Sequence, residues 1–407
     1  MKKILIFSLT YHPFVGGAEV AIKEITDRLP EYEFHMITLR FDRALPRVEE
    51  KGAITVYRIG PVITNPHVSD RNMPFLLRLG KWLYPIHAAL VAIALHRTEH
   101  YALTWSMMAN HAGFAGMFFK LFNPSVPHIL ELQDGRAFAD MKDRQPILRL
   151  LWPLYTRMYR CADRIKVISN FLANEVQKLG VSSPVSIIPN GVDVAKFSAH
   201  VPDETIMDLK NKLNKQMGDV FLFTASRLVL SRGVEDTIRA LFYLPHHVKL
   251  VVAGSGDDKA KLEAIADESG VRDRVQFVGH VDHSELPAYY KVSDIFVRPS
   301  IIEGFGVAFV EAFAAGIPVV ATPVGGIPDF LFDPDTNPDK APTGLFCALR
   351  DPESIAKAVT RYMENPALVS EIAANAKTLV TEKYDWNSIA KLQKTQLFET
   401  ALAQTPR

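Results

Sequence analysis

Two acidic residues and a glycine pair near residue 300 are the strongest candidates for chemistry in this sequence. Glu303, Gly304, Phe305 and Gly306 precede an apolar stretch that predicts a helix, and Glu311 lies eight positions after Glu303. If Glu303 sits in the leading loop and Glu311 in the helix, both carboxylates can face one ligand. An unpaired charge among apolar neighbours is costly. We therefore interpret Glu311 as paired or ligand-bound, with an exposed surface charge as the alternative.

Two arginines follow the predicted strand Phe221–Ala225. Arg227 lies just beyond this strand, and Arg232-Gly233 opens the next predicted helix. Two guanidinium groups at one strand-to-helix turn can hold a diphosphate through paired hydrogen bonds. The N-terminus of the helix adds a favourable potential for an anion. The alternative is a pair of solvated surface arginines.

Gly16 and Gly17 follow the first apolar run, Ile4–Phe7, and open a predicted helix. Paired glycines let backbone N–H groups approach a phosphate or a sugar at a helix N-terminus. The alternative is a tight turn with close packing. The pattern is not GxGxxG, so the sequence does not support a nicotinamide site.

The elements that must position these residues are parallel strands. Continuous apolar runs, which are typical of parallel strands covered on both faces, alternate with helix-like stretches. This pattern predicts doubly wound α/β sheets. After the first run the predicted strand cores are Phe34–Thr38, Ala102–Trp105, Ile129–Leu132, Ile165–Ile168, Val185–Ile188, Phe221–Ala225, Lys249–Ala253, Val275–Val278, Ile295–Val297 and Val319–Ala321.

A break in this rhythm divides the chain. Residues 193–218 are polar, contain Pro202 and show no clear strand, so we interpret them as a linker region. We predict two Rossmann-like domains, residues 1–199 and 200–385, with a final amphipathic helix at 386–407 that packs back on the first domain. In such sheets ligands bind beyond the carboxyl ends of the strands, and two facing domains share the cleft between them.

The composition excludes several function classes. The 407 residues carry 46 Lys and Arg against 45 Asp and Glu, which argues against a nucleic-acid-binding protein with one large basic field. Residues 1–199 carry 24 basic and 17 acidic residues, a net charge of +7. Residues 200–407 therefore carry 22 basic and 28 acidic residues, a net charge of −6. Two distant cysteines give no disulfide framework or zinc motif. Without a secretory leader pattern, we expect a cytoplasmic protein.

Two stretches of the first half combine aromatic, leucine and basic residues. They are Pro74–Tyr84 and Leu148–Arg160. Such mixtures occur in helices that lie on membrane surfaces, and also in ordinary core helices with solvated arginines. The basic first half fits an anionic membrane or a phosphorylated acceptor.

The motifs, taken in order, closely resemble those of the retaining glycosyltransferases of family 4 (group 1). The resemblance covers almost the whole chain. It implies the GT-B fold, an NDP-sugar donor (a UDP- or GDP-sugar), retention of anomeric configuration, a lipid-linked or glycan acceptor, and no required metal or cofactor. The motifs are Gly16-Gly17-Ala18-Glu19, Pro189-Asn190-Gly191-Val192-Asp193, Arg227 with Arg232-Gly233, Gly254-Ser255-Gly256, Phe277-Val278-Gly279, Glu303-Gly304-Phe305-Gly306 with Glu311, and Gly325-Gly326-Ile327-Pro328-Asp329.

The resemblance also implies a role for each matching residue. Arg227 and Arg232 would hold the donor diphosphate, Glu303 the sugar hydroxyls and Glu311 the ribose. The backbone positions implied at the donor are Gly304, Phe305 and Gly306 at sugar and phosphate, Val278 and Gly279 at the base, and Gly16 and Gly17 at the phosphates or the reacting sugar.

Two residues depart from the family pattern. Arg232 stands where a lysine is usual, which keeps the charge and changes the geometry. Gln133 stands where the family often has a histidine, and an amide cannot act as acid or base. It can hydrogen-bond the donor sugar. Asp134 is a candidate catalytic contact, with a turn-forming role as the alternative.

Three other functions share parts of this pattern. A GT-B-fold NDP-sugar 2-epimerase would use the same diphosphate site, and the motif series argues against it. A dinucleotide-dependent oxidoreductase is disfavoured because GxGxxG is absent. A non-catalytic sugar-nucleotide-binding protein stays open because of Gln133.

Overall fold

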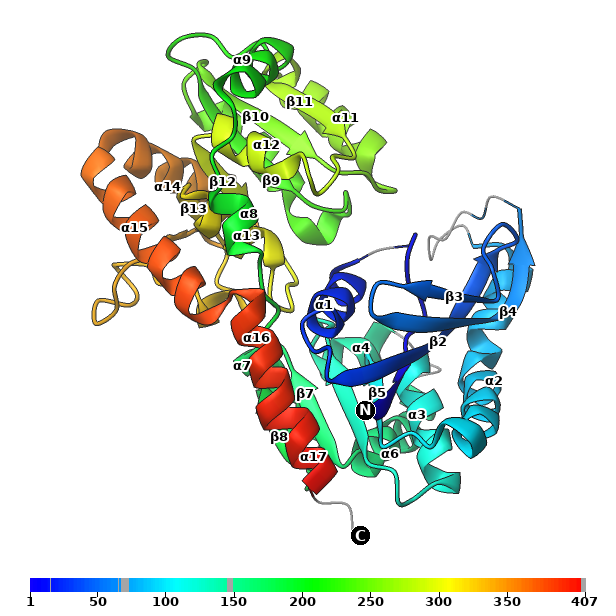
Figure 1. The fold of residues 1–407 in the computed structure, drawn as a ribbon. Helices are drawn as coiled ribbons and strands as arrows, with labels where there is room; N and C mark the ends of the chain where they lie inside the picture. The colour runs from blue at the N-terminus through cyan, green and yellow to red at the C-terminus, as the bar shows by residue number, and fades with distance from the viewer. Residues whose placement is uncertain (15, 65, 67–72, 145–148, 404–407) are drawn as a thin grey trace. The chain divides into compact units, whose positions relative to one another are not determined.

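The computed structural model describes residues 1–14, 16–64, 66, 73–144 and 149–403. The chain forms two compact units (Figure 1). Unit 1 comprises Met1–Asn190 together with Trp386–Arg407, and unit 2 comprises Gly191–Asp385. The chain therefore leaves unit 1 once and returns to it once. Val192 and Asp385 form a β-bridge, so the outgoing and returning segments run side by side.

Unit 1 is built on an eight-stranded sheet in the order β3-β4-β2-β1-β5-β6-β7-β8. All neighbours pair in parallel except β3 and β4, which are antiparallel. The strands are β1 (Lys2–Phe7), β2 (Tyr32–Asp42), β3 (Val48–Lys51), β4 (Ile54–Ile63), β5 (Leu103–Met107), β6 (His128–Leu132), β7 (Arg164–Val167) and β8 (Val185–Ile187).

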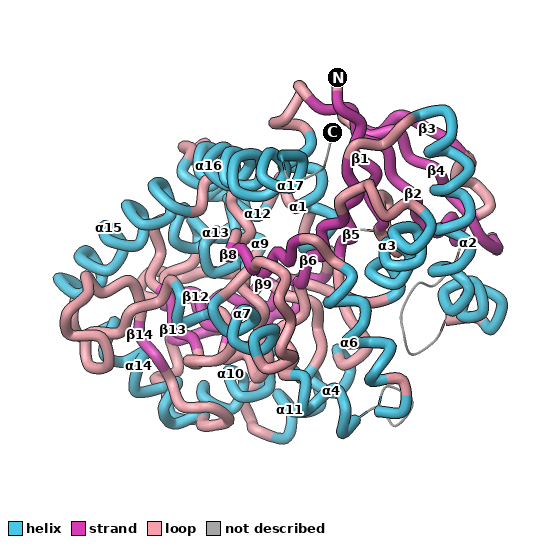
Figure 2. Tube along the Cα trace, turned by 90° about the horizontal axis from the view of Figure 1, so that it is seen from below, coloured by secondary structure: helices cyan, strands magenta, loops and turns pink. Residues whose placement is uncertain are grey.

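Helices cover both faces of this sheet. On one face α1 packs beside α16, and α3 lies beside α2 and α6 on the other (Figures 1 and 2). The helices are α1 (Gly17–Thr26), α2 (Phe75–Glu99), α3 (His111–Phe122), α4 (Phe138–Arg144), α6 (Trp152–Cys161), α7 (Asn170–Gln177), α16 (Trp386–Leu392), a π-helical turn (Gln393–Phe398) and α17 (Glu399–Ala403).

The C-terminal segment is part of the core of unit 1. Trp386, Ile389 and Phe398 are buried in the cluster that contains Trp105 of β5. The ring centroids of Trp105 and Phe398 lie 5.6 Å apart. An amphipathic helix at the end of the chain thus forms a wall of the first unit rather than a tail.

Unit 2 is a six-stranded parallel sheet in the order β11-β10-β9-β12-β13-β14. Its strands are β9 (Val220–Ala225), β10 (Val248–Ala253), β11 (Val275–Gly279), β12 (Ile295–Arg298), β13 (Val319–Ala321) and β14 (Leu345–Phe346). Its helices are α8 (Val194–Ser198), α9 (Asp203–Lys212), α10 (Val234–Ala240), α11 (Lys259–Glu268), α12 (Leu286–Val292), α13 (Val307–Ala315), α14 (Pro352–Glu364) and α15 (Pro366–Lys383).

Three features differ from the expectation. Residues 193–218 are not a linker, because they form α8 and α9, and Leu209 and Leu213 are buried at an i, i+4 spacing. The division of the chain falls after Asn190, nine residues before the predicted boundary, since α8 packs against α13 of unit 2. The antiparallel β3–β4 pair was also unexpected. β4 begins with alternating buried and half-buried residues, so it lacks the continuous apolar run by which other strands were predicted.

Candidate active site

In unit 2, the predicted donor residues follow neighbouring strands at the carboxyl edge of the sheet. Arg227 and Arg232 lie after β9, and Glu303 lies after β12, which pairs directly with β9. Gly279 ends β11 at the same edge. Because parallel strands end on one side, the fold gathers these residues where ligands of open α/β sheets bind.

Glu303 is a buried carboxylate held by two arginines. Its Oε2 accepts hydrogen bonds from Arg298 Nη2 at 2.5 Å and Arg232 Nη1 at 2.8 Å. Arg298 ends β12 and is itself buried, and this burial lowers the pKa of its guanidinium while Glu303 opposes the shift. Arg298 had no predicted role. The sequence feature that could have identified Arg298 as a site residue is its position at the carboxyl end of an apolar strand.

Arg227 differs from Arg232. Its side chain is exposed, and among the described residues it makes no side-chain hydrogen bond or ion pair. The loop that carries it is fixed to the loop after β10, because Leu228 N–H donates to the Ser255 carbonyl at 2.8 Å and Asp258 N–H donates to the Leu228 carbonyl at 3.1 Å. A fixed backbone with an unengaged guanidinium suits an anion-binding role.

Glu311 is buried on α13 and is not the exposed charge of the alternative interpretation. Its Oε2 accepts from the Tyr290 hydroxyl at 2.9 Å, and its Oε1 lies 3.2 Å from His283 Nε2. Burial and the neighbouring carboxylate raise the pKa of Tyr290 well above its usual value, so the hydroxyl stays a donor. His283 Nδ1 lies 2.6 Å from Lys196 Nζ. His283 is not predicted by the sequence, because its neighbours form no motif.

Gly306 and Gly325 shape the loop around Glu303. Gly306 precedes α13 with φ +98°, where a side chain would meet the Phe309 ring at 2.4 Å. Gly325 has φ +56°, and a Cβ there would lie 1.7 Å from the Glu303 carbonyl oxygen. Phe305 is buried against Phe330, with ring centroids 5.2 Å apart, so its backbone rather than its side chain is available to a ligand.

Gly325→Ala should destabilise unit 2 and displace the Glu303 loop. Gly316→Ala is the matched control, because Gly316 also has positive φ, at +79°, but has nothing within 4 Å of the added Cβ. Both variants bear a backbone cost of about 1–2 kcal/mol. Urea unfolding should show Gly325→Ala to be destabilised by roughly 2 kcal/mol more than the control. Equal losses in the two variants would contradict the close approach.

In unit 1, Gly16 and Gly17 lie at the start of α1, after β1. The Glu19 carboxylate accepts from Gly16 N–H at 2.8 Å and from the Thr10 hydroxyl. This capping arrangement fixes the loop. Apart from its chain neighbours and its own helix backbone, no heavy atom of the described residues lies within 4 Å of where a Cβ of Gly17 would be, so its surroundings there are open.

Gln133 follows β6 and is held in one orientation. It exchanges hydrogen bonds with Asn190, at 3.1 and 2.8 Å, and its amide donates to Glu131 at 2.6 Å. Glu131 is fully buried with Lys166, at 2.9 Å, and accepts from Trp105 Nε1 at 2.8 Å. Because both donors of its NH₂ group are engaged, Gln133 offers a ligand its remaining oxygen lone pair.

Asp134 forms a local turn. Its Oδ1 accepts from Arg136 N–H at 3.2 Å, and its carboxylate pairs with the Arg136 guanidinium. This is the turn-forming role that the sequence left open. The half-exposed carboxylate stays available for a polar contact.

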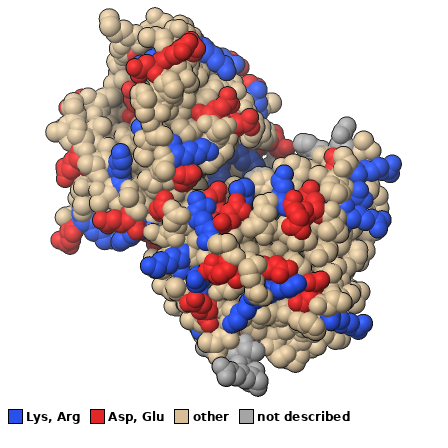
Figure 3. All heavy atoms as spheres, in the orientation of Figure 1, with Lys and Arg blue, Asp and Glu red and all other residues tan. Residues whose placement is uncertain are grey.

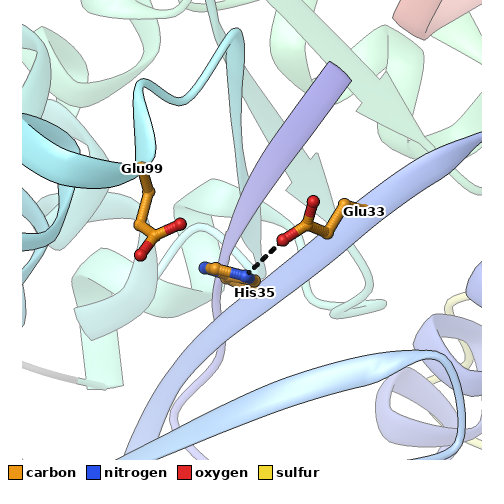
Figure 4. Close-up of side chains that lie close together, drawn as sticks. All are labelled: Glu33, His35 and Glu99. Atoms are coloured by element: carbon orange, nitrogen blue, oxygen red, sulfur yellow. Dashed lines mark hydrogen bonds and ion pairs between the residues drawn. The ribbon is translucent and has the colours of Figure 1, made fainter. Parts of the chain in front are cut away.

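A separate acidic cluster lies in unit 1 (Figure 4). Glu33, His35 and Glu99 have ligand atoms within 4.8 Å of one another. The Lys3 ammonium lies 2.6 Å from Glu99 and 3.1 Å from Glu33, so a cation of the chain already pairs with both carboxylates. His35 Nδ1 is within 2.8 Å of the Tyr101 hydroxyl. We interpret this group as an ion-pair cluster that ties β1, β2 and α2 together.

Comparisons with known proteins place this geometry in a family. Residues 206–379 match the family of glycosyl transferases group 1, and residues 15–196 match glycosyltransferase family 4. An uncharacterized glycosyltransferase of Methanocaldococcus jannaschii is 30% identical over 399 residues, which cover 96% of each chain. The chain is a group 1 glycosyltransferase.

Solved structures show that this glycosyltransferase has the GT-B fold. Sucrose-phosphate synthase from Thermosynechococcus elongatus superposes with a TM-score of 0.81 at 22% identity, covering 99% of this chain and 100% of that one. Anabaena HepE, solved with UDP and glucose, gives 0.76 at 19% identity, covering 98% and 100%. The predicted family and fold are thereby confirmed.

Proposed function

We propose that this glycosyltransferase moves a sugar from an NDP-sugar to a lipid-linked or glycan acceptor with retention of anomeric configuration. The observation that carries the proposal is the grouping of Arg227, Arg232 and buried Glu303 at the carboxyl edge of the unit 2 sheet. The neighbour solved with UDP and glucose supports a sugar nucleotide as donor, and UDP- or GDP-sugars are our candidates.

The proposed chemistry needs charge stabilisation rather than a nucleophile. As the glycosidic bond to the diphosphate breaks, negative charge develops on the leaving group, and Arg227 and Arg232 would stabilise it without a metal. Glu303 would accept hydrogen bonds from sugar hydroxyls. Retention would follow from attack on the same face of the sugar, assisted by the leaving phosphate. We place this reaction in the cytoplasm, since both cysteines are free thiols.

A thermal-shift screen against a panel of NDP-sugars tests the donor. A ligand at about 100 times its Kd should stabilise the protein by roughly 2.7 kcal/mol. With the stabilising donor in hand, NMR of the product reports the anomeric configuration. An inverted product would overturn retention. NDP-sugar epimerised without an acceptor would support the 2-epimerase, and binding without turnover would support a non-catalytic protein.

Glu311→Gln should weaken donor binding. Ionised Glu311 would accept hydrogen bonds from the ribose hydroxyls, and charged hydrogen bonds contribute about 1.5–3 kcal/mol. The donor Kd, measured by calorimetry, should therefore rise roughly 10- to 100-fold. Glu353→Gln, which removes an exposed acid of α14 in the same unit, is the control. An unchanged Kd in Glu311→Gln would count against the ribose role.

A further inference from the structure

The outer face of α2 carries a continuous apolar stripe. Seven large apolar side chains along it are between 42% and 79% exposed. At 100° per residue they fall within an arc of about 120°. Such a patch on one helix exceeds the scattered apolar residues of an ordinary surface. The stripe consists of Phe75, Leu76, Leu79, Trp82, Leu83, Ile86 and Leu90.

The opposite face of α2 is fixed in the core of unit 1. Leu77, Tyr84 and Ala88 are buried there, and the Tyr84 hydroxyl donates to the carbonyls of Ser8 and Ile37 at 3.0 and 2.7 Å. By length and composition alone, α2 could cross a membrane. Because one side packs on the sheet, α2 neither spans a bilayer in this fold nor turns its stripe inward.

The charges around the stripe are of one sign. No Asp or Glu occurs from Phe75 to Thr98, and two exposed arginines border the stripe: Arg78 lies about 40° from its edge in the first turn, and Arg97 continues its line in the last turn. The first acid, Glu99, ends the helix and is paired with Lys3. Elsewhere, basic and acidic side chains are interleaved over most of the face seen in Figure 3. An apolar strip with aromatic and basic residues is typical of helices that lie in an anionic bilayer interface.

The stripe begins at the edge of the sheet that carries the candidate site residues. Tyr84 contacts Ser8, which follows β1, and the Trp82 ring lies 5.7 Å from that of His111, the first residue of α3. Since α2 runs antiparallel to the strands, the turns before Tyr84 extend toward the carboxyl edge. Gly16 and Gln133 belong to this same edge.

We propose that the outer face of α2 is a membrane-docking surface. It lies in the headgroup region of an anionic bilayer and brings the carboxyl edge of the unit 1 sheet close to the lipid surface. Three exposed leucines in and just before α6, namely Leu150, Leu151 and Leu154, extend the apolar contact on the same side of the sheet. The first residue of the second predicted stretch, Leu148, is outside the described residues. The docking proposal holds whichever NDP-sugar the enzyme uses as donor.

Co-sedimentation with vesicles tests the proposal. The full chain should bind phosphatidylcholine vesicles that contain phosphatidylglycerol, and bind pure phosphatidylcholine more weakly. The variant L79S/L83S/I86S should partition at least roughly tenfold less onto the anionic vesicles, because each substitution removes apolar surface from the contact. The charge-reversal variant R78E/R97E should lose the preference for anionic lipid. Phe242→Ser, which removes a 72% exposed residue of unit 2, is the matched control and should bind as the wild type does.

Three results would overturn the proposal. The first is no wild-type binding to anionic vesicles, and the second is equal binding by the triple variant. The third is a wild-type dimer in sedimentation velocity that the triple variant dissociates, which would assign the stripe to a second copy of the chain. Circular dichroism and the NDP-sugar thermal shift verify that the variants are folded. Donor binding is measured without vesicles, so failure of docking and failure of the proposed function are separate results.

Discussion

Arg227→Ala should lower kcat/KM roughly 100- to 1000-fold while leaving the unfolding temperature unchanged. Removing one preorganised group that stabilises developing negative charge has an effect of this size. The Arg227 side chain is exposed and makes no side-chain hydrogen bond among the described residues, so the fold does not need it. Steady-state kinetics with the identified donor, together with a melting curve, measure both quantities.

The control for Arg227→Ala is Arg239→Ala. Arg239 is a 46% exposed arginine of α10 in the same unit, and its loss removes the same charge away from the strand end. It should leave kcat/KM close to the wild-type value. If Arg227→Ala also retains the wild-type kcat/KM, Arg227 does not hold the leaving diphosphate.

Lys166→Met should cost about 3–5 kcal/mol of unfolding free energy, because it leaves the Glu131 carboxylate buried without its cation. Both side chains of this pair are fully buried. The double variant Glu131→Leu with Lys166→Met should recover part of the loss, since no uncompensated charge stays in the core. Urea denaturation of the wild type, both single variants and the double variant gives the coupling energy.

An exposed pair provides the comparison for Lys166. Lys357 and Glu353 of α14 lie 2.8 Å apart, with side chains 74% and 55% exposed. Lys357→Met should change the unfolding free energy by no more than about 0.5 kcal/mol. A loss below about 1 kcal/mol in Lys166→Met would mean that water or a rearranged side chain compensates Glu131.

Parallel strands were the most predictable part of this fold. Ile4–Phe7, Phe221–Phe223 and Val319–Ala321 are buried on both faces, so their sequences are uninterrupted apolar runs. The edge pair β3–β4 and the helix α9 were missed for the opposite reason. Most residues of β3 and α9 face solvent, and β4 has only alternating buried residues over its first half. A single row of apolar residues such as Leu209 and Leu213 gives a weak periodic signal.

The candidate site was predicted in part. Glycines, arginines and glutamates at strand ends are local features, and their order along the chain carried the family resemblance. The partners of these residues are not local. Arg232 meets Glu303 from the loop after another strand, Lys166 meets Glu131 from the neighbouring strand, and His283 meets Glu311 from another element. Only the register of the sheets and the packing of helices bring such pairs together.

The chain leaves unit 1 near Val192 and returns to it after Asp385, and this path affects the order in which the two units fold during synthesis. Unit 2 is a continuous segment, so it has all of its residues once Asp385 has left the ribosome. Unit 1 is started first, but its hydrophobic core lacks Trp386, Ile389 and Phe398 until the last part of the chain emerges. Because domains generally fold as units, the N-terminal unit is the last to be completed. A chain halted before Trp386 would therefore present a finished unit 2 together with an unfinished unit 1 whose apolar surface is exposed, and such surfaces are bound by chaperones.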